Sequence, residues 1–347
     1  MERKAYSDPL SRVGVIVIGR NEGARLRLAL SSVVGSGVAA VYYVDSGSTD
    51  GSIELASSLG VRVHSLSADR PFSAARARRE GVEVLLRDFP SVHLIQFVDG
   101  DCELAEQWLE AACEAFQQSD DVAIVCGRLA ESHPEASVYN RLSDLQWRAP
   151  IGDIAACGGI FMIRRSAYEQ AGGFNAALVT REEKDLCDRV HALGHRVVRI
   201  DAMMAWHDAG LLRFDQWWRR AVWGGYGDAV QIGERSGPLL ASHRRRIRRY
   251  LTWPVVVPLV ALLGLLASWW WLGFLLLPAF GILAYALQGV RMARWRLRSG
   301  DSVREALTYA SMRTLRRFAS GYGFMLYFLG RDQQGRRPDP HRPQSRS

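Results

Sequence analysis

The sequence predicts an α/β domain with a largely parallel sheet, followed by a pair of membrane helices. Four β-branched apolar runs, at residues 13–18, 38–44, 61–66 and 92–98, alternate with segments of helical periodicity. Near-continuous apolar strands are typical of parallel sheets that are covered on both faces, so this alternation indicates a β-α-β domain. A later stretch, residues 251–290, has no charged side chain and indicates a segment that crosses a bilayer.

The chain exceeds the length of one average domain, and we expect it to divide into four segments. They are an N-terminal tail (1–12), the α/β domain (13–240), a basic membrane region (241–330) and a disordered tail (331–347).

The distribution of charge supports the membrane assignment. The net charge is +8, yet residues 241–347 contain 18 arginines and 4 acids, which leaves the first 240 residues acidic. Since the basic side chains flank the uncharged stretch, they favour a membrane surface as partner and argue against nucleic acid. A single 40-residue helix would extend ~60 Å, about twice the hydrocarbon thickness, so a hairpin of two spans at about 251–290 is expected. A buried hairpin in the core of a soluble protein is the alternative.

The ends of this hairpin predict its orientation. The tryptophans of "SWWWLG" (268–273) suit an interface at the outer tip, and the arginine-rich flanks suit the cytoplasmic side. The run at about 318–330 is too short to span comfortably and predicts an interfacial or re-entrant helix. The polar N-terminus lacks a signal peptide, and five cysteines without C-x-x-C spacing fit a reducing compartment. We therefore expect a multi-pass protein of the cell (inner) membrane with a cytoplasmic α/β domain.

Acidic loops follow three of the predicted strands: "GRNEG", "DSGSTDGS" and "DGDCE". Ligands of such sheets bind beyond the carboxyl ends of the strands, so these loops are expected to converge on one site. A nicotinamide-binding domain would also place an acid at Asp45, but "GRNEGA" lacks the G-x-G-x-x-G phosphate cradle. Taken singly, each loop is equally well explained as a turn followed by a helix N-cap.

Six segments in order resemble family 2 glycosyltransferases across residues 13 to about 235. The segments are "VIVIGRNEG", "VDSGSTDGS", "SAARARREG", "FVDGDCE", "CGGIFMIRRSAYEQAGGF" and "REEKDLCDRV". The resemblance implies a GT-A fold, with a Rossmann-like mixed sheet that is mostly parallel and flanked by helices. It also implies a metal-dependent enzyme of the hexosyltransferase type that uses a nucleotide-sugar donor. A terminal membrane hairpin also occurs in members of this family.

The resemblance implies a role for individual residues. Asp101 would contact a divalent cation, Mg²⁺ or Mn²⁺, Asp99 the cation or the ribose, Asp45 the base and Arg78 the diphosphate. A hard cation held by oxygen ligands would meet the charge that grows on the leaving diphosphate. The remaining implied positions are Arg20, Asn21, Glu22 and Gly100 for the donor and Gly158, Gly159 and Asp185 on the acceptor side. His207 in "AWHDAG" is a further candidate metal ligand, although a lone histidine after a strand is more often structural.

The catalytic base implied by the resemblance is Glu183, with Glu182 as the alternate. Many relatives have Glu-Asp where this chain has Glu182-Glu183, and two acids where it has Asp45-Ser46. Glu183 is also explained by a capping box with Thr180 at the start of a helix. "QWWRRA" (216–221) lacks the last tryptophan of the Q-x-x-R-W motif of processive synthases, which weakens a processive reading.

Three functions follow from these patterns. The first is a membrane-anchored, inverting glycosyltransferase that acts on a hydroxyl of a lipid-linked acceptor in glycan or polysaccharide synthesis. The second transfers the sugar to a polyprenyl phosphate instead. The third is a non-catalytic membrane scaffold that retains the fold, against which the intact Asp45, Asp99 and Asp101 argue.

Overall fold

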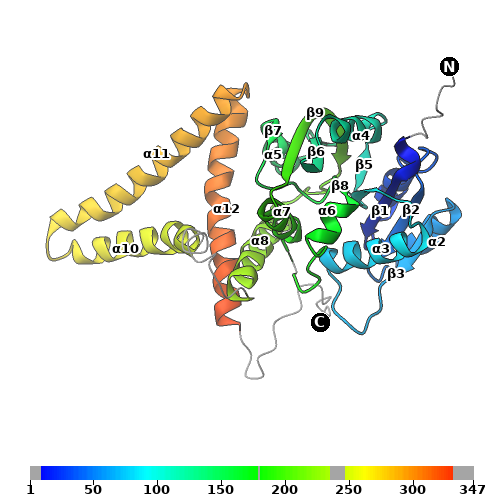
Figure 1. Cartoon of the computed structure of the whole chain (residues 1–347). Helices are drawn as coiled ribbons and strands as arrows, with labels where there is room; N and C mark the ends of the chain where they lie inside the picture. Colours follow the sequence, from blue (N-terminus) through cyan, green and yellow to red (C-terminus); the bar gives the residue numbers. More distant parts are fainter. Residues whose placement is uncertain (1–8, 179, 235–246, 331–347) are drawn as a thin grey trace, which may run out of the picture. The chain divides into compact units, whose positions relative to one another are not determined.

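The computed structural model describes residues 9–178, 180–234 and 247–330. These residues form two compact units that divide between Leu212 and Arg213, and each is described separately (Figure 1). The tail predicted at 331–347 lies outside the described residues, as do residues 1–8 and 241–246.

The first unit is built on a mixed sheet, which confirms the predicted fold class. Within the described residues its strands run in the order β3-β2-β1-β4-β8-β6-β9-β5, and β7 pairs with β9. The strands are β1 (Val13–Gly19), β2 (Ala40–Asp45), β3 (Arg62–Ser65), β4 (Leu94–Asp99), β5 (Cys102–Leu104), β6 (Val122–Glu131), β7 (Gly152–Asp153), β8 (Phe161–Arg164) and β9 (Arg196–His207).

The four strands predicted from β-branched runs are β1 to β4. They pair in parallel, so their carboxyl ends lie at one edge of the sheet. β8 continues the sheet antiparallel to β4 and β6, while β5 pairs antiparallel with the end of β9. This last pairing places Cys102 opposite His207 and joins two segments that are far apart in the sequence.

Helices cover the sheet of the first unit (Figure 1). They are η1 (Pro9–Arg12), α1 (Ala24–Ser31), α2 (Ser52–Ser58), α3 (Ala74–Asp88), α4 (Trp108–Gln118), α5 (Val138–Trp147), α6 (Arg165–Gln170) and α7 (Glu182–Ala192). α3 begins at the N-cap Ser73, whose side chain accepts from the amide of Arg76. It packs closely on the sheet because Gly81 leaves room for Ile16 and Val44. This packing buries Arg78 beside the carboxyl end of β4.

The second unit is helical, with elements α8 (Phe214–Glu234), η2 (Thr252–Val256), α10 (Val257–Ala267), η3 (Leu272–Leu275), α11 (Leu276–Arg298) and α12 (Val303–Leu329). α8 packs along α12, where Gly225 and Gly323 leave no room for a side chain against the facing backbone. The compact unit therefore begins at Arg213, whereas the sequence places the boundary at residue 240.

The run at 318–330 belongs to a longer helix than the sequence predicts. Ser302 and Glu305 form a capping box that begins α12, and the helix then continues for 27 residues. Residues 318–329 are its second half and not a separate short helix. Their contact with a bilayer surface stays a prediction.

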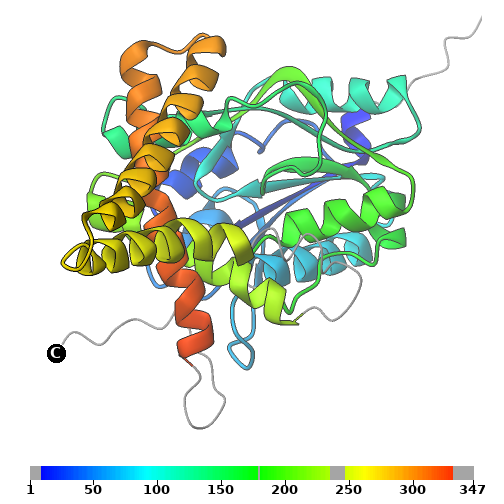
Figure 2. The ribbon, with the colours of Figure 1, turned by 90° about the vertical axis from the view of Figure 1, so that its left-hand side faces the viewer.

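Two helical segments in the second unit are long and apolar enough to span a membrane. They are Ile247–Ala267 and Leu272–Arg298, with mean hydropathies of 2.0 and 1.7. α10 and α11 form the arms of a hairpin (Figures 1 and 2), and Gly264 packs against Leu277 and Pro278 where the arms meet. At the tip, Trp269 and Trp270 are 90% and 88% exposed. So much exposed apolar surface is not what a buried core hairpin would show.

Candidate active site

The loops after β1 and β2 are held together by hydrogen bonds between their polar residues. The Asn21 amide donates to Ser48 Oγ (3.0 Å), and the Thr49 amide donates to Asn21 Oδ1 (2.7 Å). The Gly23 amide donates to Asp50 Oδ2 (3.0 Å). The residues of "GRNEG" and "DSGSTDGS" therefore form one polar surface at the carboxyl edge of the sheet.

Asp45 organises the second of these loops from within. Its side chain is almost fully buried and accepts from the Tyr43 hydroxyl (2.9 Å) and from the amides of Gly47 (2.8 Å) and Ser48 (2.9 Å). A carboxylate with these partners fixes the loop backbone, an arrangement typical of Asx turns. Contact between Asp45 and a base stays a prediction.

Arg78 is the centre of a buried charge cluster that joins α3, β4 and α7. One terminal nitrogen donates to Asp99 Oδ1 and the other to Glu182 Oε1, each at 2.6 Å. Glu183 Oε1 lies 3.6 Å from Arg78 Nη1, and the guanidinium also packs on the Phe174 ring. Both are charge-assisted hydrogen bonds, which are shorter and stronger than those between neutral groups. The predicted residues Arg78, Asp99 and Glu183 thus lie together.

The two acids at the start of α7 have different environments. Glu182 is 4% exposed and is taken up by its hydrogen bond to Arg78. The side chain of Glu183 is 19% exposed and has the longer contact. Burial, followed by the charge of Glu182, raises the pKa of Glu183 to about 7. Of the two, Glu183 is better suited to accept a proton near neutral pH.

The helix α7 begins differently from the predicted capping box. It starts at Glu182, and its N-cap residue is Arg181, in a left-handed conformation with φ of 59°. Thr180 therefore lies outside the cap position, and the predicted capping box is wrong. Among the described residues, Asn21 and Arg181 are the two non-glycine residues with positive φ, and both belong to this site. Such backbone conformations cluster at functional sites.

The loop that carries Gly158 and Gly159 packs directly on the charge cluster. A Cβ at Gly159 would lie 2.5 Å from both Arg78 Nη2 and Asp99 Oδ2, whereas a Cβ at Gly158 would meet nothing within 4 Å. The Sγ atoms of Cys157 and Cys187 are 3.6 Å apart, which fixes the start of this loop to α7. All five cysteines are free, in agreement with the sequence.

Asp101 and His207 form a candidate metal site. His207 Nε2 lies 3.4 Å from Asp101 Oδ2, and Cys102 completes a group whose ligand atoms lie within 4.8 Å of one another. His207 is 7% exposed, and its Nδ1 has no hydrogen-bond partner among the described residues and faces Glu131 at 3.8 Å. A carboxylate behind an imidazole is the usual support of a metal-binding histidine. The carboxylate of Asp101 fits Mn²⁺ or Mg²⁺, whereas the imidazole of His207 is a more usual ligand of transition metals than of Mg²⁺.

Cys102 is a poor ligand in this group, because burial raises the pKa of its thiol well above its ordinary value. Asp99 differs from Asp101 in that one oxygen is already hydrogen-bonded to Arg78. The two aspartates of "DGD" therefore face different partners, Asp99 the arginine and Asp101 the histidine.

The remaining predicted donor residues surround this edge. Burial and the nearby charge of Asp101 raise the pKa of Glu22, while Arg25 pairs with it at 2.7 Å. The Gly100 amide donates to Ile18 O (2.7 Å), and a Cβ at Gly100 would lie 3.0 Å from Glu22 Cγ. Arg20 stacks on the Phe72 ring, 5.2 Å from its centroid. The structure thus brings residues 20–22 close to the "DGD" turn.

Asp185 has a structural partner. It is buried and pairs with Arg189 one turn along α7, at 2.8 Å.

The sequence interpretation missed three residues of the site: Glu131 and Trp147, which contact His207, and Phe174, which packs on Arg78. Glu131 could have been found as an acid at the carboxyl end of an apolar run. The two aromatic residues have no such signal.

The chain is similar to known glycosyltransferases. Residues 14–172 match the family model described as glycosyl transferase family 2. Glycosyltransferase AglE of Haloferax volcanii is 24% identical over 210 residues, which cover 57% of this chain and 67% of that protein. Pre-mycofactocin glycosyltransferase of Mycobacterium tuberculosis is 28% identical over 245 residues, or 66% of this chain and 50% of that protein. The chain thus spans about half the length of the mycobacterial relative.

A solved structure shares the fold over nearly the whole chain. It is the mannosyltransferase PcManGT from Pyrobaculum calidifontis, in complex with GDP-Man and Mn²⁺. The TM-score is 0.53 and the sequence identity 17%, with 94% of this chain and 90% of that chain covered.

Proposed function

We propose that this chain, whose residues 14–172 match the family model of glycosyl transferase family 2, is a membrane-anchored, inverting glycosyltransferase. It transfers a hexose from a nucleotide-diphospho-sugar to a hydroxyl group of a lipid-linked acceptor, in glycan or polysaccharide synthesis, at the cytoplasmic face of the cell membrane. The observation that carries the proposal is the Arg78 cluster, in which Asp99 and Glu182 hold the guanidinium beside Glu183.

Glu183 is the general base of this reaction. An acceptor hydroxyl has a pKa far above neutrality and must lose its proton as it attacks the anomeric carbon. A carboxylate with a pKa of about 7 is half ionised at neutral pH and accepts that proton. Direct displacement on the face opposite the leaving group inverts the anomeric configuration.

Arg78, Asp101 and His207 act on the leaving diphosphate. Arg78 supplies a fixed positive charge, held in place by two carboxylates and Phe174. Asp101 and His207 are the residues that would hold Mg²⁺ or Mn²⁺, with Asp99 beside them. Such a cation, when bound, neutralises charge on the leaving group. Gly100 and Gly159 keep side chains out of the space around these groups.

Membrane anchorage is supported by the two apolar segments, by the exposed tryptophans at the hairpin tip and by the arginines at its base. A cysteine replacing Gly273 is expected to react with a membrane-impermeant thiol reagent from outside, and one replacing Ser299 is not. Because native cysteines also react, both variants are made in a chain whose five cysteines are serine. Labelling of both positions from the same side would exclude the hairpin.

The raised pKa of Glu183 favours a hydroxyl acceptor over the alternative, a polyprenyl phosphate. A phosphate acceptor is already ionised and needs no base. The site also argues against a non-catalytic scaffold, since such a protein has no use for a cluster of buried charges that costs desolvation energy.

The experiment that tests the proposal is a screen of the purified full chain for hydrolysis of nucleotide-sugars, with Mn²⁺, with Mg²⁺ and with a chelator. We expect at least one UDP- or GDP-hexose to be hydrolysed in the presence of metal and not with the chelator. Hydrolysis that the chelator leaves unchanged would exclude the metal dependence, and no hydrolysis of any donor would favour the scaffold.

A further inference from the structure

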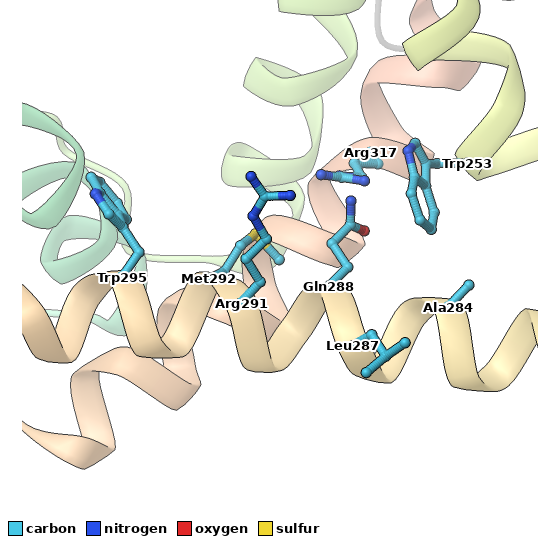
Figure 3. Close-up of a pocket in the computed structure, with 8 residues that line it drawn as sticks. All are labelled: Trp253, Ala284, Leu287, Gln288, Arg291, Met292, Trp295 and Arg317. Carbon is cyan, nitrogen blue, oxygen red and sulfur yellow. The ribbon is translucent and has the colours of Figure 1, made fainter.

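A pocket of ≈ 720 Å³ lies in the second unit (Figure 3). Its lining comes from η2, α11 and α12: Trp253, Ala284, Leu287, Gln288, Arg291, Met292, Trp295 and Arg317. Those from α11 recur at three- and four-residue spacing, so they share one face of that helix. Figure 3 shows Gln288 and Arg291 extending from α11 on the same side as the head of Arg317.

Two arginines line this pocket and no acidic side chain does. Residues 247–330 contain ten arginines and only two acids, Asp301 and Glu305. Asp301 pairs with the buried Arg296 at 2.5 Å, and Glu305 caps α12 through Ser302. Neither acid lines the pocket. An anion from outside the chain is therefore the natural partner of Arg291 and Arg317.

One polar atom of the lining supports this conclusion. Among the described residues, no hydrogen-bond partner is found for the buried donor atom Arg317 Nη1. Burial, and next the charges of Arg249 and Arg313, lower the pKa of Arg317. A partly buried cation without an acidic partner is costly, and a bound anion would lower that cost.

The rest of the lining is apolar, as a lipid chain requires. Trp253 stacks on Arg317, with 5.0 Å between the guanidinium carbon and the ring centroid. Trp253 lies near the start of the first apolar segment and Arg291 near the end of the second. The pocket therefore lies at the basic end of the hairpin, opposite the Trp269–Trp271 tip. In a membrane this end lies at the level of the phosphate headgroups.

We propose that this pocket binds the headgroup of an anionic membrane phospholipid. Arg291 and Arg317 hold the phosphate, Gln288 donates its amide to it, and an acyl chain lies along Ala284 and Leu287. No carboxylate lines the pocket, so it offers no base for sugar transfer and serves to bind the lipid. The inference rests on the membrane anchorage in the proposed function.

The test is a binding titration by native mass spectrometry on the full chain in a neutral detergent. The probes are phosphatidylglycerol, phosphatidylcholine, a polyprenyl phosphate and inorganic phosphate. We expect phosphatidylglycerol to bind about tenfold more tightly than phosphatidylcholine. Arg291→Gln and Arg317→Gln are each expected to weaken phosphatidylglycerol about tenfold, the loss typical of one charge-assisted contact. Arg317→Lys keeps the charge and is expected to retain most of the affinity.

The matched control is Arg294→Gln, since Arg294 is an exposed arginine on the same helix that does not line the pocket. It is expected to change the affinity less than about twofold, as a screened surface charge does. An equal loss in this variant would reduce the effect to general surface charge and overturn the proposal. Displacement of phosphatidylglycerol by inorganic phosphate, or tighter binding of the polyprenyl phosphate, would also overturn it.

This readout needs no sugar transfer, so it is independent of the donor hydrolysis screen. A chain that hydrolyses donors but binds both phospholipids equally would contradict only the lipid site. A chain that selects phosphatidylglycerol but hydrolyses no donor would contradict only the proposed activity.

Discussion

Arg78 in the first unit and Arg317 in the second have opposite surroundings. In the first, Arg78 is held by Asp99 and Glu182 at 2.6 Å and has a third carboxylate within 3.6 Å. In the second, Arg317 lines a pocket that contains no acidic side chain. The comparison shows two uses for an arginine that is partly or wholly withdrawn from water. Satisfied by its own chain, it fixes the geometry of a site, and left without an acid, it selects an anionic ligand.

The largest effect on stability is expected from substitution of Arg78, which pairs with two carboxylates. Arg78→Ala leaves Glu182 buried without its cation and is expected to lower the free energy of unfolding by about 3 kcal/mol, as broken buried pairs do. The measurement is the midpoint temperature of unfolding by calorimetry. The control is Arg87→Ala on the same helix, where an exposed side chain pairs only with Asp88 and the midpoint is expected to stay unchanged. Equal stability of both variants would mean that the cluster does not hold the fold.

The second prediction concerns Asp101 in the candidate metal site, where a substitution is expected to lower the rate of sugar transfer without changing the fold. Asp101→Ala removes a partly exposed carboxylate beside His207 and is expected to reduce metal-dependent transfer at least about a hundredfold. Circular dichroism should show an intact fold. Glu103→Ala, two residues along and outside the metal group, should retain activity. Wild-type turnover in Asp101→Ala would remove this residue from the mechanism.

A smaller effect is expected in the loop that carries Gly158 and Gly159, and it tests how tightly this loop packs on Arg78 and Asp99. Gly159→Ala places a Cβ 2.5 Å from Arg78 and Asp99 and is expected to cost about 1–3 kcal/mol of stability, with a raised KM for the donor. Gly158→Ala is the adjacent control, because its Cβ would meet nothing within 4 Å. If the two substitutions behave alike, the contact between this loop and the cluster does not matter.

The sequence predicted the parallel half of the sheet and its loops well, because β-branched runs and acidic turns are local signals. β1 to β4 were found within two residues of their bounds, and the family match confirms the resemblance. The pairing of Arg78 with Glu182 was not predictable, since 104 residues separate them and their contact depends on how α3 and α7 pack. The pairing of β5 with β9, which brings Asp101 to His207, is likewise a property of the assembled sheet.

Two boundaries in the structure differ from those expected from the sequence, and both differences have the same cause. The sequence ends the first domain at residue 240 and treats 318–330 as a separate helix, but α8 and α12 pack along each other. Their glycines carry no apolar signal, although Gly225 and Gly323 are what lets the two helices approach. The packing of α8 on α12, which are distant in sequence, thus sets these two boundaries, and local sequence patterns do not reveal it.

The most direct test of the central claim is the pH dependence of transfer to a hydroxyl acceptor. Glu183 must be ionised to accept a proton, and burial raises its pKa to about 7. The turnover number should therefore rise about tenfold per pH unit up to about pH 7 and level off above it. Glu183→Gln should lose ~10² to 10⁴ in turnover and this pH dependence with it, without a change in donor affinity. Glu182→Gln, which weakens the hold on Arg78, should keep the inflection. An inflection near pH 7 that survives in Glu183→Gln, or a Glu183→Gln enzyme as fast as wild type, would contradict the assignment of Glu183 as the base.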